Sequence, residues 1–76
     1  MPIFSFLAYP EKSMKDQLIK DLAAMQYCEV KPAENQDVLI LLTETPDEET
    51  SKTLIDTIRD LKSLQSLSMT FGHTDS

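Results

Sequence analysis

The apolar residues of this chain fall first into a short run and then into a helical spacing. Residues 3–8 form an apolar and aromatic run of strand length, which Tyr9-Pro10 ends. Four apolar residues then follow at spacings that place them on one face of a helix: Met14, Leu18, Leu22 and Met25. Ser13 with Asp16 can cap the start of this helix, or Pro10 can occupy its first turn.

Two more strands and a second helix follow. Residues 27–30 form a brief strand that ends at Pro32 and the polar loop 34–37, and residues 38–44 form the most apolar strand. At the second helix, Thr45 is the predicted N-cap, Pro46 the first helical residue, and Glu48 completes a capping box. The apolar stripe of this helix comprises Leu54, Ile55, Ile58 and Leu61.

The last segment completes a known topology. Residues 64–71 form a strand in which Leu67, Met69 and Phe71 alternate with Ser68 and Thr70, before a polar tail from Gly72. The order strand-helix-strand-strand-helix-strand predicts an α+β, ferredoxin-like fold, because right-handed crossovers give a four-stranded antiparallel sheet with both helices on one face. The 76 residues make a single domain, residues 1–76, with about 73–76 as a flexible tail.

Two predicted strands depart from the pattern of a sheet covered on one side. Such strands should alternate apolar and polar residues, but residues 3–8 and 38–42 are apolar at both parities. In this fold they form the adjacent central pair. The open face should therefore carry a contiguous apolar patch, with Ser68 and Thr70 as a polar border. A homodimer packed sheet to sheet and a bound foreign peptide are equally compatible with this patch.

Charge and cysteine content narrow the range of partners. Thirteen acidic and seven basic residues give a net charge of −6, which serves solubility and repels nucleic acid and anionic lipid. We therefore expect no nucleic-acid partner and no direct membrane binding. Cys28 is the only cysteine, so no internal disulfide can form. The N-terminal run lacks the charged region of a signal peptide, and a cytoplasmic location is expected.

The residue inventory does not favour an enzyme. His73 is the only histidine and lies in the predicted tail, and Cys28 is expected to pack rather than react. Gly72 is the only glycine, which excludes a phosphate-binding loop, and there is no CxxC metal motif. The first loop, residues 9–13, lacks the arginine and glycine of an acylphosphatase-type site. We expect no catalytic residue, metal site or cofactor.

Several short matches, in order along the chain, carry a resemblance to a known family. They are Ser5-Phe6-Leu7, Cys28-Glu29-Val30, Leu39-Ile40 with Glu44, Thr53-Leu54-Ile55-Asp56-Thr57-Ile58, and His73. Over about residues 4–73 the chain resembles the NapD family, cytoplasmic chaperones that bind the twin-arginine signal peptide of NapA, the catalytic subunit of the periplasmic nitrate reductase. It departs from the family pattern at Gln26-Tyr27, where a Pro-Gly turn is common.

The resemblance implies a signal peptide bound as a helix over the open sheet face. For the apolar floor of that site we select Ser5, Leu7, Ile40 and Leu42, although the opposite parity of the same strands is also apolar. Glu29 and Glu44 are the candidate partners of the peptide's arginines, or else solvated charges at strand ends.

The implied function is a chaperone, monomeric and without enzymatic activity. It would hold back export of a NapA-type reductase, or a related molybdoenzyme, until maturation is complete. The alternative is a homodimeric regulatory or interaction module whose open sheet face is its own interface.

Overall fold

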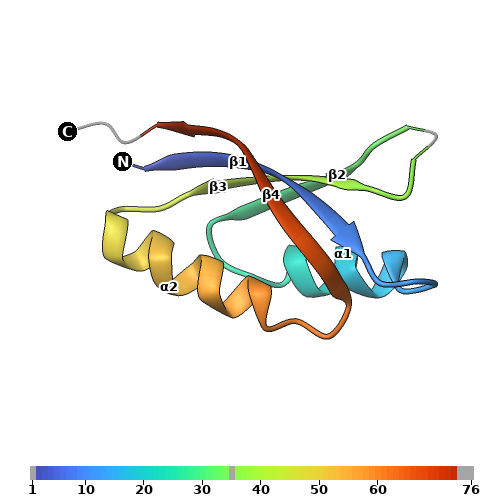
Figure 1. The fold of residues 1–76 in the computed structure, drawn as a ribbon. Helices are drawn as coiled ribbons and strands as arrows, with labels where there is room; N and C mark the ends of the chain where they lie inside the picture. The colour runs from blue at the N-terminus through green and yellow to red at the C-terminus, as the bar shows by residue number, and fades with distance from the viewer. Residues whose placement is uncertain (1, 35, 74–76) are drawn as a thin grey trace.

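The chain folds into two layers, a four-stranded antiparallel sheet and two helices on one of its faces (Figure 1). The computed structural model describes residues 2–34 and 36–73. The elements follow in the order β1 (Ile3–Pro10), α1 (Lys15–Ala23), β2 (Cys28–Pro32), β3 (Leu39–Glu44), α2 (Glu48–Arg59) and β4 (Leu64–His73). The strand order β2-β3-β1-β4 confirms the predicted ferredoxin-like fold, with β1 and β3 at its centre.

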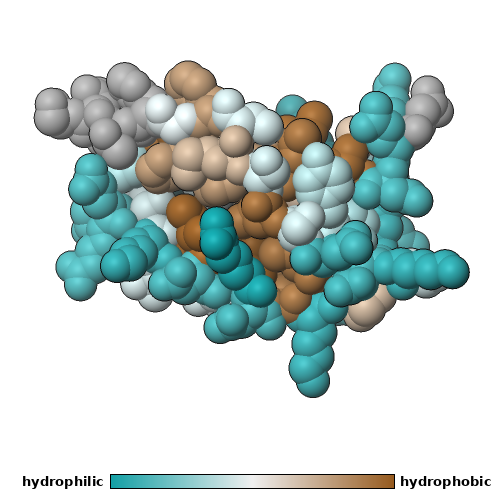
Figure 2. Space-filling model, in the orientation of Figure 1, coloured by the Kyte–Doolittle hydropathy of each residue, from teal (hydrophilic) through white to brown (hydrophobic). Residues whose placement is uncertain are grey.

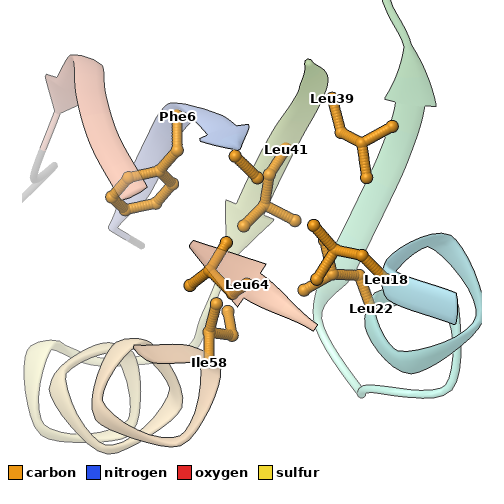
Figure 3. Packing of buried hydrophobic residues seen from close by; sticks show 8 residues of the cluster. Phe6, Leu18, Leu22, Leu39, Leu41, Ile58 and Leu64 are labelled. Atoms are coloured by element: carbon orange, nitrogen blue, oxygen red, sulfur yellow. The ribbon is translucent and has the colours of Figure 1, made fainter. Parts of the chain in front are cut away.

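Alternate residues of the two central strands point toward the helices. Leu39, Leu41 and Thr43 of β3 are buried, and so are Phe6 and Ala8 of β1. They meet side chains from the apolar faces of both helices, namely Leu18, Leu22 and Ile58 (Figure 3). Full burial of one such leucine contributes about 2 kcal/mol, so this one cluster holds the two layers together.

The first helix begins in a way that neither prediction anticipated. Met14 occupies the N-cap of α1 and makes no side-chain hydrogen bond there. Ser13 has a left-handed backbone with φ 66°, and the Met14 N–H donates to the Glu11 carbonyl at 2.9 Å. Pro10 belongs to β1. A tight turn through Ser13 therefore starts the helix, and the predicted caps, Ser13 with Asp16 or Pro10 in the first turn, are wrong.

The second helix starts two residues later than predicted. At its N-cap, the carboxylate of Asp47 accepts a hydrogen bond from the Thr50 N–H at 2.7 Å. Thr45 is buried, and its backbone N–H is bonded to the segment before β1, so it stays with the sheet. The predicted cap at Thr45, with Pro46 in the helix and Glu48 completing a capping box, is wrong because Glu48 is itself the first helical residue.

A bulge in β4 changes which of its side chains reach the open face. Met69 lies opposite Phe6 of β1, whereas Phe71 lies opposite Ser5. One step along β1, from Phe6 to Ser5, therefore corresponds to two steps along β4, and Thr70 is the extra residue of this bulge. The Thr70 hydroxyl donates to the Ser5 carbonyl at 3.0 Å. Phe71 therefore joins Ser5 on the open face, and the predicted regular alternation of this strand with a polar border is wrong beyond the bulge.

The far end of β4 also exposes apolar surface on the helix side. Met69 is 53% exposed, and its sulfur and the Phe4 ring both lie against Gly72. A Cβ at Gly72 would approach the Phe4 ring to 2.8 Å, so the only glycine of the chain is required here for close packing. Figure 2 shows apolar residues reaching the surface over β4 and between the sheet and α2, with hydrophilic residues on either side.

The ends of the other elements differ from the predictions by a few residues. β1 continues through Pro10, and Leu61 lies beyond the end of α2 although it was predicted within its apolar stripe. β4 continues to His73, two residues into the segment predicted as a polar tail. Residue 35 of the predicted loop and residues 74–76 lie outside the described residues.

A buried hydroxyl ties α1 to the connection between α2 and β4. Ser63 is buried, and its hydroxyl donates to the Asp21 carboxylate at 2.6 Å. This hydrogen bond, with a weaker contribution from Gln17, lowers the pKa of Asp21 from its ordinary value of 3.8. The folded state therefore favours the ionised carboxylate.

Ser63→Ala should destabilise the fold in a pH-dependent manner. A carboxyl with a lowered pKa in the folded state stabilises that state above its unfolded pKa, and the stabilisation is lost as the pH falls through the folded value. We expect the urea midpoint of Ser63→Ala to lie below that of the wild type at neutral pH, and the two to converge below pH 3.8. Ser66→Ala, an exposed change on β4, is the control; a Ser63→Ala difference that persists on acidification would contradict this role.

Candidate functional site

The sheet face that the helices leave open collects the remaining side chains of the central strands. Strand pairing places Leu42 beside Ser5, and Ile40 beside Leu7. From β4, the bulge adds Phe71 next to Ser5. We call these five residues of β1, β3 and β4 the apolar floor. Four of them are the residues that the sequence predicted for this surface.

The apolar floor is accessible from outside. Ile40 and Leu42 are 43% and 37% exposed, and Phe71 is 56% exposed; Ser5 and Leu7 are half-buried. Their neighbours along the chain lie in the core, as Phe6, Leu39 and Leu41 are at most 1% exposed. This burial decides the parity that the sequence left open. A contiguous apolar surface of this kind is typical of a contact site.

Both predicted acidic residues lie at one corner of the floor. Glu29 of β2 is paired with Leu42, and Glu44 ends β3. Together with Tyr27, Cys28 and Leu42 they line a hollow of about 330 Å³. A smaller hollow of about 170 Å³ lies further along β2 and β3, and its lining includes Lys31 and Ile40. Two carboxylates beside an apolar surface suit a ligand that carries cationic groups next to an apolar segment.

Two residues of this surface were not predicted from the sequence. Phe71 reaches it only because of the bulge at Thr70, and no glycine or proline there signals a bulge. Tyr27 borders the acidic hollow because its backbone has φ 69°, a conformation that bulky side chains rarely adopt. In both cases an irregular backbone, rather than a side-chain pattern, brings the residue to the site.

The half-buried environment of Cys28 at this corner makes its thiol unreactive. Cys28 is half-buried, lies opposite Thr43 of β3 and packs against the core cluster. Burial raises the pKa of the thiol to about 11, so it is protonated at neutral pH, and a protonated thiol is a poor nucleophile. Its packing role follows from this environment.

Other kinds of site receive no support from the part of the chain that the structure describes. Within residues 2–34 and 36–73, His, Cys, Asp and Glu side chains nowhere gather in threes at distances suited to a metal ion. In the same ranges, neither helix has the length and apolar content needed to cross a bilayer. The open sheet face with its acidic corner is therefore the candidate site.

Comparison with known proteins agrees with this architecture. A solved structure described as the solution structure of the E. coli Tat proofreading chaperone protein NapD superposes with a TM-score of 0.81 at 21% identity, covering 97% of this chain and 78% of that one. At that identity the likeness establishes a shared fold. No curated protein matches the sequence. The family model described as NapD protein matches residues 1–76. The chain therefore belongs to the NapD protein family.

Proposed function

We propose that this protein is a chaperone that binds the twin-arginine signal peptide of a NapA-type reductase, or of a related molybdoenzyme, over its open sheet face. Bound in the cytoplasm, it would hold back export until the enzyme is mature. Membership of the NapD family supports this proposal, as does the shared fold with an E. coli protein described as a Tat proofreading chaperone. The observation that carries it is the exposed apolar floor with two glutamates at one corner.

The dimensions of the floor suit one helix. It spans β3, β1 and β4, which is two inter-strand spacings of about 4.8 Å, or about 10 Å in all. An α-helix with its side chains is about 10–12 Å across. A helical peptide whose apolar residues recur every three or four positions can therefore bury one stripe against the floor. Covering a half-exposed Ile40, Leu42 or Phe71 contributes roughly 1 kcal/mol each before the costs of association.

Charge complements this apolar contact. The acidic hollow holds Glu29 and Glu44 on the side of the floor away from Phe71. A guanidinium group pairs with a carboxylate through two parallel hydrogen bonds, which fixes orientation as well as adding affinity. The net charge of −6 attracts a cationic segment over longer distances. In the homodimer alternative, two copies of a chain with a net charge of −6 would have to approach each other, and this overall repulsion opposes their association.

Single glutamate substitutions on the two faces of the central strands should separate folding from binding. At Leu7, Ile40 and Leu42 we expect variants that keep the circular dichroism spectrum and cooperative melting of the wild type but no longer bind the signal peptide. At Phe6, Leu39 and Leu41 we expect unfolding, because an unpaired buried charge costs several kcal/mol against a total stability of about 5–10 kcal/mol.

The two sets are each other's controls, since they alternate along the same strands. Open-face variants that fold and still bind the peptide with wild-type affinity would rule out the sheet face as the site. Sedimentation of the free wild type distinguishes the alternative function. A dimer that the open-face variants convert to monomers would identify the face as a self-interface.

Binding should also weaken with salt and with loss of the peptide's arginines. The screening length falls from about 30 Å to about 8 Å as ionic strength rises from about 0.01 to about 0.15 M. Over that range we expect the Kd measured by calorimetry to rise, and to rise again when both arginines are replaced by glutamine. A peptide with the same arginines and a scrambled apolar segment tests the apolar contact separately. A Kd that stays the same across this salt range and after replacement of both arginines would contradict the electrostatic contribution.

The cysteine should be dispensable for binding. Cys28→Ala removes a half-buried packing group, for which a loss of about 1 kcal/mol in unfolding free energy is expected, and the variant should bind the peptide as the wild type does. In the folded wild type, alkylation at mildly alkaline pH should be much slower than after denaturation, because burial raises the thiol pKa to about 11. Loss of binding in a folded Cys28→Ala variant would reveal a function of the thiol.

A further inference from the structure

A second, larger hollow adjoins the acidic corner on the helix side of the turn that leads into β2. Its volume is about 470 Å³, and its lining includes Tyr27, Leu54 of α2, and the carboxyl-bearing Asp47 and Glu49. Tyr27, which is 40% exposed, is the one residue that lines both this hollow and the acidic hollow on the sheet face. Figure 1 shows the turn between α1 and β2 passing beside α2. Tyr27 therefore lies between the two hollows, at the border of the sheet face and the flank of α2.

The charged residues that line these two hollows have one sign. Glu29 and Glu44 line the first hollow, Asp47 and Glu49 the second, and neither lining contains a lysine or arginine. Three further hollows in the described part of the chain each include at least one basic residue in their lining. An exposed tyrosine between two pairs of carboxylates is the environment that a guanidinium group prefers, since the ring face attracts the cation and the carboxylates neutralise it.

The start of α2 does not reverse this charge. A helix N-terminus carries about half a positive charge, but three acidic residues stand at this one: Asp47, Glu48 and Glu49. The side chain and backbone N–H of Thr50 lower the pKa of Asp47, so this carboxyl is ionised well below neutral pH. The second hollow is therefore anionic despite the helix end beside it.

We infer that Tyr27 is a specificity-determining residue for the cationic segment of the bound peptide. The apolar stretch lies on the floor, and the arginine-bearing segment before it passes over Tyr27 into the hollow beside α2, with one guanidinium stacked on the tyrosine ring. This inference rests on the proposed function and extends its site from the sheet face onto the flank of α2. It predicts a preference for arginine over lysine, because the planar guanidinium stacks on an aromatic face and the ammonium does not.

The backbone of Tyr27 provides an unusual test. Its φ of 69° favours glycine or asparagine, and its carbonyl accepts a hydrogen bond from the Glu44 N–H at 3.1 Å, which any residue can keep. Tyr27→Gly and Tyr27→Asn should therefore melt at or above the temperature of the wild type. The same variants should lose affinity for the peptide. A stabilising change that weakens binding is not expected of a residue whose role is structural.

Calorimetry with two synthetic peptides measures the effect. One carries paired arginines before an apolar segment, and the other carries lysines at the same positions. For Tyr27→Gly and Tyr27→Asn we expect the Kd for the arginine peptide to rise about 5- to 30-fold, the range that one cation–π contact provides, and the Kd for the lysine peptide to change less. Tyr27→Phe, which keeps the ring, should bind as the wild type does.

Ser13→Gly is the matched control, because Ser13 is the other non-glycine residue with a left-handed backbone among residues 2–34 and 36–73. Ser13 follows the C-terminal end of β1, whereas Tyr27 lies just before β2. It should raise stability without altering either Kd. Wild-type binding of the arginine peptide by both Tyr27→Gly and Tyr27→Asn would overturn the inference. If Leu42→Glu still abolishes binding in that case, the proposed sheet-face function stands. Failure of the wild type itself to bind either peptide would instead overturn the proposed function.

Discussion

Two helices can cover only one face of a four-stranded sheet, and the two central strands of this protein are apolar on both faces. Phe6, Leu39 and Leu41 turn inward and form the core with α1 and α2. Ile40 and Leu42 alternate with Leu39 and Leu41 along β3 and point to the other face. They are 43% and 37% exposed. Exposed apolar surface of this kind favours association, so the surface is typical of a site that a partner covers. The sheet therefore has one face covered by helices and one open face, and the proposed ligand would bind to the open one.

Acidic residues restrict which partner can cover that surface. An apolar face without charges would also suit a second copy of the chain. Here, Glu29 and Glu44 lie together at one corner, and the chain carries a net charge of −6. The net charge opposes association of two copies, whereas a peptide with a cationic end and an apolar stretch would complement both the acidic corner and the apolar floor. Under the proposed function, apolar contact would supply affinity, and the carboxylates would select and orient the ligand.

Periodicity predicted the larger part of the fold because it follows directly from burial. The spacing of Leu18 and Leu22, and the alternation along β4 up to its bulge, allow one arrangement of layers. The choice of inward parity on β3 could not be predicted, since both of its faces are apolar and only the packing against the helices decides between them. Periodicity alone could not select the candidate site residues, and the resemblance to the family suggested them.

The details that sequence reasoning missed all depend on local backbone geometry. Asp47 rather than Thr45 caps α2, because the Asp47 carboxylate accepts from the Thr50 N–H, whereas the Thr45 hydroxyl donates to the Asp47 carbonyl. Thr70 adds a bulge that transfers Phe71 to the open face, and Tyr27 adopts a left-handed conformation. Each of these choices is made by long-range pairing, which residue preferences do not encode. Two of these three details, the bulge at Thr70 and the backbone of Tyr27, change which residues line the open sheet face and its acidic hollow.

The most direct test of the account is an NMR titration of the labelled protein with the signal peptide. Amide and methyl signals of residues on the open face should shift most, with Leu7, Ile40, Leu42 and Phe71 at the centre. Signals from the solvent-facing side of α1, such as those of Asp16 and Lys20, should remain unchanged. Large shifts confined to the outer surface of the helices, with the open sheet face unperturbed at saturation, would contradict the central claim.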